Sequence, residues 1–79
     1  MFQYYVIEIT RTHAGEYAHN VLWAYDEDIN RARLKGESKY YERLAAAAVS
    51  EYASHAVTLM AADGTALMSK AYVHAATEG

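Results

Sequence analysis

A long helical segment without proline, flanked on each side by two strand-like segments, most constrains how this chain can fold. Residues 28–52 are dominated by strong helix formers, including the run LAAAA at 44–48. Residues 2–11 and 17–25 are rich in β-branched and aromatic side chains, and residues 55–62 and 66–74 also have a strand pattern. This order predicts a single α+β domain over residues 1–79, ββαββ, with a four-stranded, mainly antiparallel sheet covered on one face by the helix.

Local signals place the turns and the start of the helix. Gly15 can adopt the positive φ that a tight reversal needs, and Asp63-Gly64 is a strong hairpin signal, typical of a type I′ turn. The acidic run 26–28 supplies side-chain acceptors for the first N–H groups of a helix. Gly36 lies inside the helical segment, where it marks a kink, a break into two helices or a close approach to the sheet.

The small size of the chain raises the question of what stabilises it. A domain of 79 residues buries only roughly 60% of the surface that its unfolded chain exposes. Cysteine is absent, which excludes disulfides and thiolate metal sites, so self-association or an efficient core must compensate. A net charge of −3 argues against binding to a nucleic-acid backbone. We find no secretory signal and no apolar stretch of membrane length, and we expect a cytoplasmic protein that does not engage membranes.

One helix can cover only one face of the sheet, so the other face is the candidate interface. Period-two alternation, with Val57, Leu59 and Leu67 assigned to the helix side, leaves apolar side chains on the uncovered face. Exposed apolar surface of this kind usually marks a partner site. We therefore expect a homodimer through this face or an edge strand, with a different protein partner as the alternative. The predicted interface residues are Tyr4, Val6, Thr58, Met60, Met68, Lys70 and Tyr72.

Catalytic and cofactor signals are weak throughout the chain. The four histidines, His13, His19, His55 and His74, show no close-spaced metal-binding pair. No serine has a nucleophile-elbow context, and the four glycines form no phosphate-binding loop. We predict no catalytic, metal or cofactor-binding residue and a protein that is not an enzyme. Two alternatives stay open: a small-ligand or nucleotide binder using Tyr4, Lys70, Tyr72 and His74, and a small enzyme using Glu8 and a histidine.

Several segments resemble small prophage-encoded proteins. They are residues 4–9 (YYVIEI), 37–50 (ESKYYERLAAAAVS), 55–57, 63–64 and 72–74, so the likeness spans most of the chain. The set resembles uncharacterised proteins of prophages and mobile elements in Firmicutes, and residues 30–36 look like an addition to that pattern. The resemblance implies a phage or mobile-element setting and transfers no activity. In that setting we expect a protein-interaction domain, with an inhibitor of a host protein as an alternative.

Overall fold

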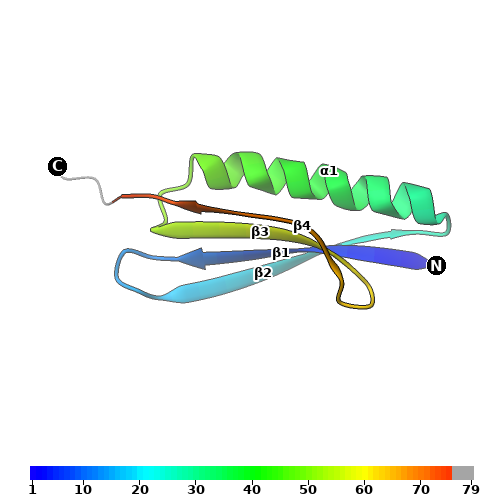
Figure 1. The fold of residues 1–79 in the computed structure, drawn as a ribbon, viewed down its shortest axis with the longest axis horizontal. Coiled ribbons are helices and arrows are strands. Elements are labelled where there is room, and N and C mark those ends of the chain that lie inside the picture. The colour runs from blue at the N-terminus through cyan, green and yellow to red at the C-terminus, as the bar shows by residue number, and fades with distance from the viewer. Residues whose placement is uncertain (76–79) are drawn as a thin grey trace.

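The computed structural model describes residues 1–75, which form four strands and one helix (Figure 1). Strands β1 (Phe2–Arg11) and β2 (Tyr17–Asp26) precede helix α1 (Ile29–Ala48), and strands β3 (Ser54–Ala61) and β4 (Ala66–Val73) follow it. The strand order in the sheet is β2-β1-β3-β4, and every neighbouring pair is antiparallel. The helix lies along one face of this sheet (Figure 1). The predicted ββαββ α+β fold is confirmed.

Strand β1 lies inside the sheet and sets the register of its neighbours. Val6 is opposite Leu22 of β2 and Leu59 of β3, so the three side chains share one face. The β1–β2 pair closes through a short connection, whereas β3 reaches β1 only after the chain has passed through the helix. The two hairpins are therefore local, and the β1–β3 pairing joins them into one sheet.

Glycines form the turns of both hairpins. Gly15 has φ 91° and Gly64 has φ 89°, the left-handed region that glycine enters without steric cost. Among the described residues no other type has a positive φ. A type I′ turn needs positive φ at both central residues, so the prediction of that turn type at Asp63-Gly64 was wrong. The chain instead shifts register between Leu59 and Met60 and closes with Gly64 N–H donating to the Ala61 carbonyl.

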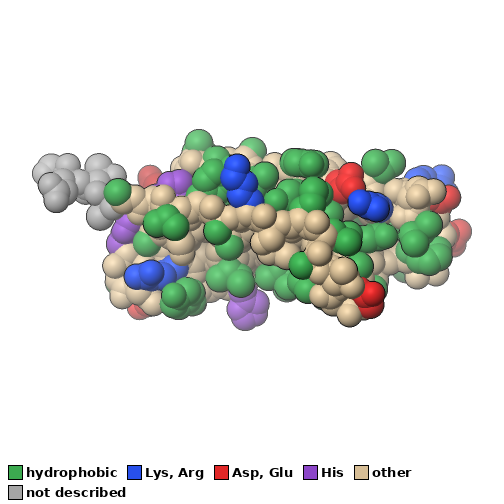
Figure 2. Space-filling view, in the orientation of Figure 1, with side chains coloured by type: hydrophobic (Ala, Val, Ile, Leu, Met, Phe, Trp, Pro, Cys, Tyr) green, Lys and Arg blue, Asp and Glu red, His purple; other side chains and the backbone are tan. Residues whose placement is uncertain are grey.

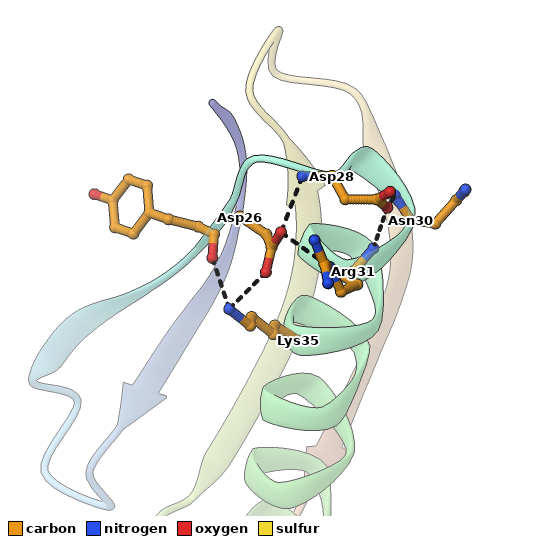
Figure 3. A network of polar contacts seen from close by, with 6 residues as sticks. Asp26, Asp28, Asn30, Arg31 and Lys35 are labelled. Atoms are coloured by element: carbon orange, nitrogen blue, oxygen red, sulfur yellow. Dashed lines mark hydrogen bonds and ion pairs between the residues drawn. The ribbon is translucent and has the colours of Figure 1, made fainter.

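A network of acidic side chains fixes the start of the helix to the end of β2 (Figure 3). Asp28 caps α1 by accepting hydrogen bonds from the N–H groups of Asn30 and Arg31 at 2.9 and 3.0 Å. Asp26, the last residue of β2, pairs with Lys35 at 2.8 Å and with Arg31 at 3.2 Å. The bonds from Lys35 and from the Asp28 N–H lower the pKa of the Asp26 carboxyl to about 2.

The helix ends earlier than its sequence predicts. Residues 49–52 were expected to be helical, but α1 stops at Ala48 and Val49 caps it. The Ser50 hydroxyl then accepts the Tyr52 N–H at 3.1 Å, a local bond that favours a turn. The next residue, Ala53, donates its N–H to the Arg11 carbonyl at 2.8 Å, so the chain must already have reversed toward β1.

Gly36 marks a close approach of the helix to the sheet and not a break. Helix α1 is continuous through Gly36, which is buried. A Cβ atom built on this residue would lie 3.0 Å from the Tyr4 Cβ and 3.0 Å from the Leu59 Cδ1. The absent side chain therefore lets the helix backbone rest directly on the β1–β3 seam.

The small core lies between α1 and the sheet and corrects the predicted faces. Val6, Val57 and Leu59 are fully buried there, and Tyr40 and Ala47 cover them from the helix. Five of the predicted interface residues lie on this covered side: Tyr4, Val6, Met68, Lys70 and Tyr72. Their assignment to the uncovered face was wrong. Leu67, assigned to the core, is 36% exposed at the β4 irregularity.

The close packing at Gly36 predicts that Gly36→Ala destabilises the protein. Alanine gains about 1 kcal/mol of helix propensity, but the new methyl group meets Tyr4 Cβ, which cannot swing aside, and overpacking costs about 1–3 kcal/mol. We expect a net loss of about 1 kcal/mol in the free energy of unfolding, measured by urea denaturation at one fixed protein concentration.

Ser38→Ala is the control, because Ser38 is exposed on the same helix and alanine there should stabilise slightly. A Gly36→Ala protein that is as stable as Ser38→Ala would contradict the close approach.

Candidate functional site

The face of the sheet opposite α1, here called the open face, carries most of the large apolar side chains that the sheet exposes. Trp23 is 46% exposed and Ile9 is 44% exposed. Cross-strand pairs such as Ile7 with Val21 and Tyr5 with Trp23 run across its β1–β2 half. Hydrophobic side chains reach the surface along the whole length of the molecule (Figure 2). The open face is formed by Gln3, Tyr5, Ile7, Ile9 and Arg11 of β1; Tyr17, His19, Val21, Trp23 and Tyr25 of β2; Ser54, Ala56, Thr58 and Met60 of β3; and Ser69, Ala71 and Val73 of β4.

The charged residues of the strands are placed differently from the usual arrangement. In a sheet with one wet face, polar side chains point to solvent and apolar ones to the core. Here the strand residues Glu8, Asp26 and Lys70 all point to the side that α1 covers. The open face carries one formal charge, on Arg11, which sits over the ring of Tyr17 at 6.0 Å. The side of this sheet without a covering layer therefore carries fewer formal charges than the covered side.

Three aromatic rings form a row on the open face. The Tyr5 and Trp23 centroids are 5.1 Å apart, and the Trp23 and Tyr25 rings are stacked at 6.1 Å with an angle of 18°. Neighbouring aromatic rings at these distances stabilise each other beyond the area they bury. The row gives part of the open face an aromatic surface, in which Trp23 and Tyr25 are 46% and 45% exposed.

Of the predicted interface residues, the structure places Thr58 and Met60 on the open face. Thr58 shares a hydrogen bond with Ser69 across β3 and β4 at 3.0 Å. The sequence prediction missed Val21, Trp23 and Tyr25 and assigned no role to Tyr5, Ile7 and Ile9, although it grouped those three on one face. Parity in β1 points the other way: Glu8 falls in the same set as Val6, and a charged residue usually marks the solvent-facing set.

A buried ion cluster lies under the C-terminal half of α1, on the covered side. Glu8 and His55 are 6% and 4% exposed and are diagonal neighbours on the paired strands β1 and β3, where Glu8 is opposite Val57 and His55 is opposite Thr10. The Glu8 Oε2 accepts hydrogen bonds from Arg43 Nε at 2.9 Å and Arg43 Nη2 at 2.8 Å, and lies 2.7 Å from His55 Nε2. Arg43 comes from the helix, so the cluster ties α1 to both central strands.

The charges in this cluster favour ionised Glu8. Burial alone raises the pKa of the Glu8 carboxyl, but the hydrogen bonds and charges of Arg43 and His55 outweigh burial and hold the pKa below its ordinary value. A carboxylate only accepts hydrogen bonds, so the His55 Nε2 carries the proton that it shares with Glu8. The other ring nitrogen, Nδ1, is buried without a hydrogen-bond partner.

Two hollows border the cluster and share Arg43, Tyr52 and His55 as walls. The larger, of about 570 Å³, extends toward the β1–β2 turn and is also lined by Thr12, His13, Ala46, Ser50 and Glu51. The smaller, of about 230 Å³, is also lined by Glu8, Thr10, Ala18, His19 and Asn20. Tyr52 packs the edge of its ring on His55 with centroids 5.9 Å apart. Because the His55 Nδ1 is covered, the cluster presents no free imidazole nitrogen to either hollow.

The structure brings together only some of the residues predicted for a small-ligand or nucleotide site, which are Tyr4, Lys70, Tyr72 and His74. Tyr72 and His74 are stacked at 6.2 Å, and Lys70 lies over the Tyr72 ring at 5.0 Å. Tyr4 is far from them: Tyr72 is level with Thr10, six residues further along β1. Within residues 1–75, no three His, Asp or Glu side chains are grouped so that they could hold a metal ion.

In the same part of the chain, no helix is both long and apolar enough to cross a bilayer. Comparison of the chain with protein-family models, with curated proteins and with solved structures finds no match.

We predict that Glu8→Gln destabilises the protein by about 2–3 kcal/mol at pH 7. Breaking one side of a buried ion pair costs several kcal/mol because the partner charge stays desolvated, and the partial exposure of Arg43 reduces that cost. The folded-state pKa of Glu8 is depressed, so its stabilising effect is present above its ordinary value of 4.5 and disappears as the pH falls through the lower folded value. Urea denaturation between pH 7 and pH 3 should show the difference from wild type shrinking with acid.

The matched control is Glu37→Gln, which removes a surface pair with Arg33 and should change stability by less than about 0.5 kcal/mol. Equal stability of Glu8→Gln and wild type at pH 7 would refute the role given to the cluster.

Proposed function

We propose that this protein is a non-enzymatic interaction domain that forms a homodimer by packing the open faces of two copies against each other. The observation that carries the proposal is the distribution of charge and apolar surface in the sheet: Glu8 and Asp26 lie on the covered side, whereas Ile9 and Trp23 are exposed on the open face. An apolar sheet face in water is unfavourable, and two such faces stacked about 10 Å apart form the core of a β-sandwich.

The size of the open face fits a small, specific interface. Strands of 8–10 residues at about 3.3 Å per residue and four strands about 4.8 Å apart give about 500–600 Å² per copy. The total of about 1,000–1,200 Å² lies at the lower end of stable protein–protein interfaces, so a dimer has to use the whole face. A second sheet of equal dimensions is the partner that covers it completely.

Charge also favours a second copy of the chain. Like net charges of −3 disfavour association at long range, but no acidic side chain of the strands lies on the open face. Two open faces can therefore pack together without burying acidic side chains against each other. A partner chosen by charge complementarity would find only Arg11 to recognise, at the end of β1.

A structural role for the Glu8–Arg43–His55 cluster supports a non-enzymatic function. Oε2 of Glu8 already accepts bonds from both other residues, and the spare nitrogen of His55 is covered. The phage or mobile-element setting and the cytoplasmic location stay predictions of the sequence. In that setting a host protein is the alternative occupant of the open face.

Ile7→Glu should dissociate the homodimer. Ile7 lies on a central strand in the middle of the open face, and burying an unpaired carboxylate costs several kcal/mol at each of its two symmetric positions. We expect the dimer Kd to rise at least about 100-fold, equivalent to about 2.8 kcal/mol. Sedimentation velocity over a range of protein concentrations measures this change.

Leu34→Glu is the control, because Leu34 is 63% exposed on the helix, and its mass should equal that of wild type. A wild-type protein that is monomeric at high micromolar concentration would overturn the homodimer. A host protein that binds wild type and not Ile7→Glu would then identify the alternative occupant.

A flat aromatic ligand is a second candidate, favoured by the row of Tyr5, Trp23 and Tyr25. Stacking on exposed rings is the way in which single-stranded nucleic acids and nucleotides bind aromatic sheet faces. Trp23 is the one tryptophan of the chain, so its fluorescence reports directly on such binding. Saturable quenching by a nucleoside monophosphate would support this candidate, and unchanged fluorescence at millimolar ligand would exclude it.

A further inference from the structure

Strand β2 is one edge of the sheet, and alternate residues along it direct their backbone groups away from β1. The Glu16 carbonyl accepts the Thr12 N–H across the first hairpin, whereas the Tyr25 carbonyl accepts Lys35 Nζ from outside the sheet. Inward and outward groups alternate along a strand, so the outward ones belong to the odd-numbered residues. Tyr17, His19, Val21 and Trp23 therefore present N–H and C=O groups at the free edge.

Strand β2 itself has none of the features that usually prevent pairing, and the Lys35 contact lies at its end, on the Tyr25 carbonyl. Natural edge strands are shortened, charged, bulged or interrupted by proline. Strand β2 has ten residues in unbroken register with β1, and from Tyr17 to Tyr25 it contains no Lys, Arg, Asp, Glu or Pro. The opposite edge, β4, is shorter, carries Lys70 and has a register irregularity beside Met60. The β4 edge therefore has features that prevent pairing with another strand, whereas strand β2 itself has none.

We propose that β2 of one copy pairs antiparallel with β2 of a second copy, centred on Val21. In this register Val21 lies opposite its own symmetry mate, His19 opposite Trp23, and Tyr17 opposite Tyr25. All of these residues direct their backbone N–H and C=O groups toward the free edge. The three central pairs, Val21 with Val21 and the two symmetric pairs of His19 with Trp23, can therefore form about six backbone hydrogen bonds. The result is one continuous eight-stranded sheet.

The self-complementarity of β2 is the reason for choosing a second copy as the partner. An antiparallel pair places like residues symmetrically about its centre, and here no two charges are opposed between Tyr17 and Tyr25. The two aromatic pairs, Tyr17 with Tyr25, fall on the open face at both ends of the contact, where cross-strand rings stabilise a sheet. Asp26 falls outside this stretch and is already paired with Lys35 and Arg31.

The edge contact and the face contact have different symmetry axes. The two-fold axis of an edge pair is perpendicular to the sheet, because both open faces stay on the same side. The two-fold axis of a face pair lies in the plane of the sheets. Where these perpendicular two-fold axes intersect, they generate a closed tetramer, the commonest assembly after the dimer. The tetramer rests on the proposed function, whereas the β2–β2 pairing stands without it.

The test substitutes proline at Val21 and measures mass by sedimentation equilibrium, with circular dichroism to check folding. The Val21 N–H points out of the sheet, so Val21→Pro removes an edge donor while the β1–β2 ladder stays intact. Ala71→Pro is the matched control, since Ala71 has the equivalent position on the β4 edge. His19→Pro, at another exposed outward position, replaces Val21→Pro if that variant fails to fold.

We expect wild type and Ala71→Pro to have the mass of four chains, and Val21→Pro and Ile7→Glu each to have the mass of two. The double variant should be a monomer. A Val21→Pro mass equal to wild type, or an Ile7→Glu protein that is monomeric, would overturn the edge pairing and leave the face dimer. A monomeric Val21→Pro beside a dimeric Ile7→Glu would confirm the edge pairing and overturn the face dimer.

Discussion

The pairing of β1 with β3 is the interaction on which the rest of this structure depends. It joins two local hairpins into one sheet and places Glu8 beside His55, residues that are 47 positions apart in the chain. Gly36 rests on the same seam, against Tyr4 and Leu59. The position of the helix, the core and the buried ion cluster therefore all follow from one register between strands that are distant in sequence.

That register also determines where the apolar surface goes. The space under α1 is shared between a small core around Val6 and Leu59 and an ion cluster around Glu8. A mixed layer of this kind buries less apolar area than an all-hydrophobic one, and a buried ion pair adds little net stability. An apolar surface that includes Ile9, Trp23 and Tyr25 is left on the open face. Association would bury it and compensate for the small core of a chain of this length.

The two proposed contacts would contribute different things to an assembly. The open face offers apolar area, so its burial would supply free energy through a non-directional interaction. The β2 edge offers a row of backbone donors and acceptors, which fix a register but bury little apolar surface. Together the two proposed contacts would join four copies of a small domain in one closed, symmetric tetramer.

Features that depend on nearby residues could be predicted from the sequence alone. The glycine turns, the acidic cap at Asp28 and the order of two hairpins around one helix all rest on local chemistry. The faces of the sheet could not be assigned in this way. Alternation divides each strand into two sets but does not say which set lies under the helix, and in β1 both sets are apolar. Thr58 and Met60 were placed correctly, whereas Val6 was not, because only its pairing with Leu59 decides its face. Register between distant strands is a tertiary property, and it alone determined which side of this sheet was left open.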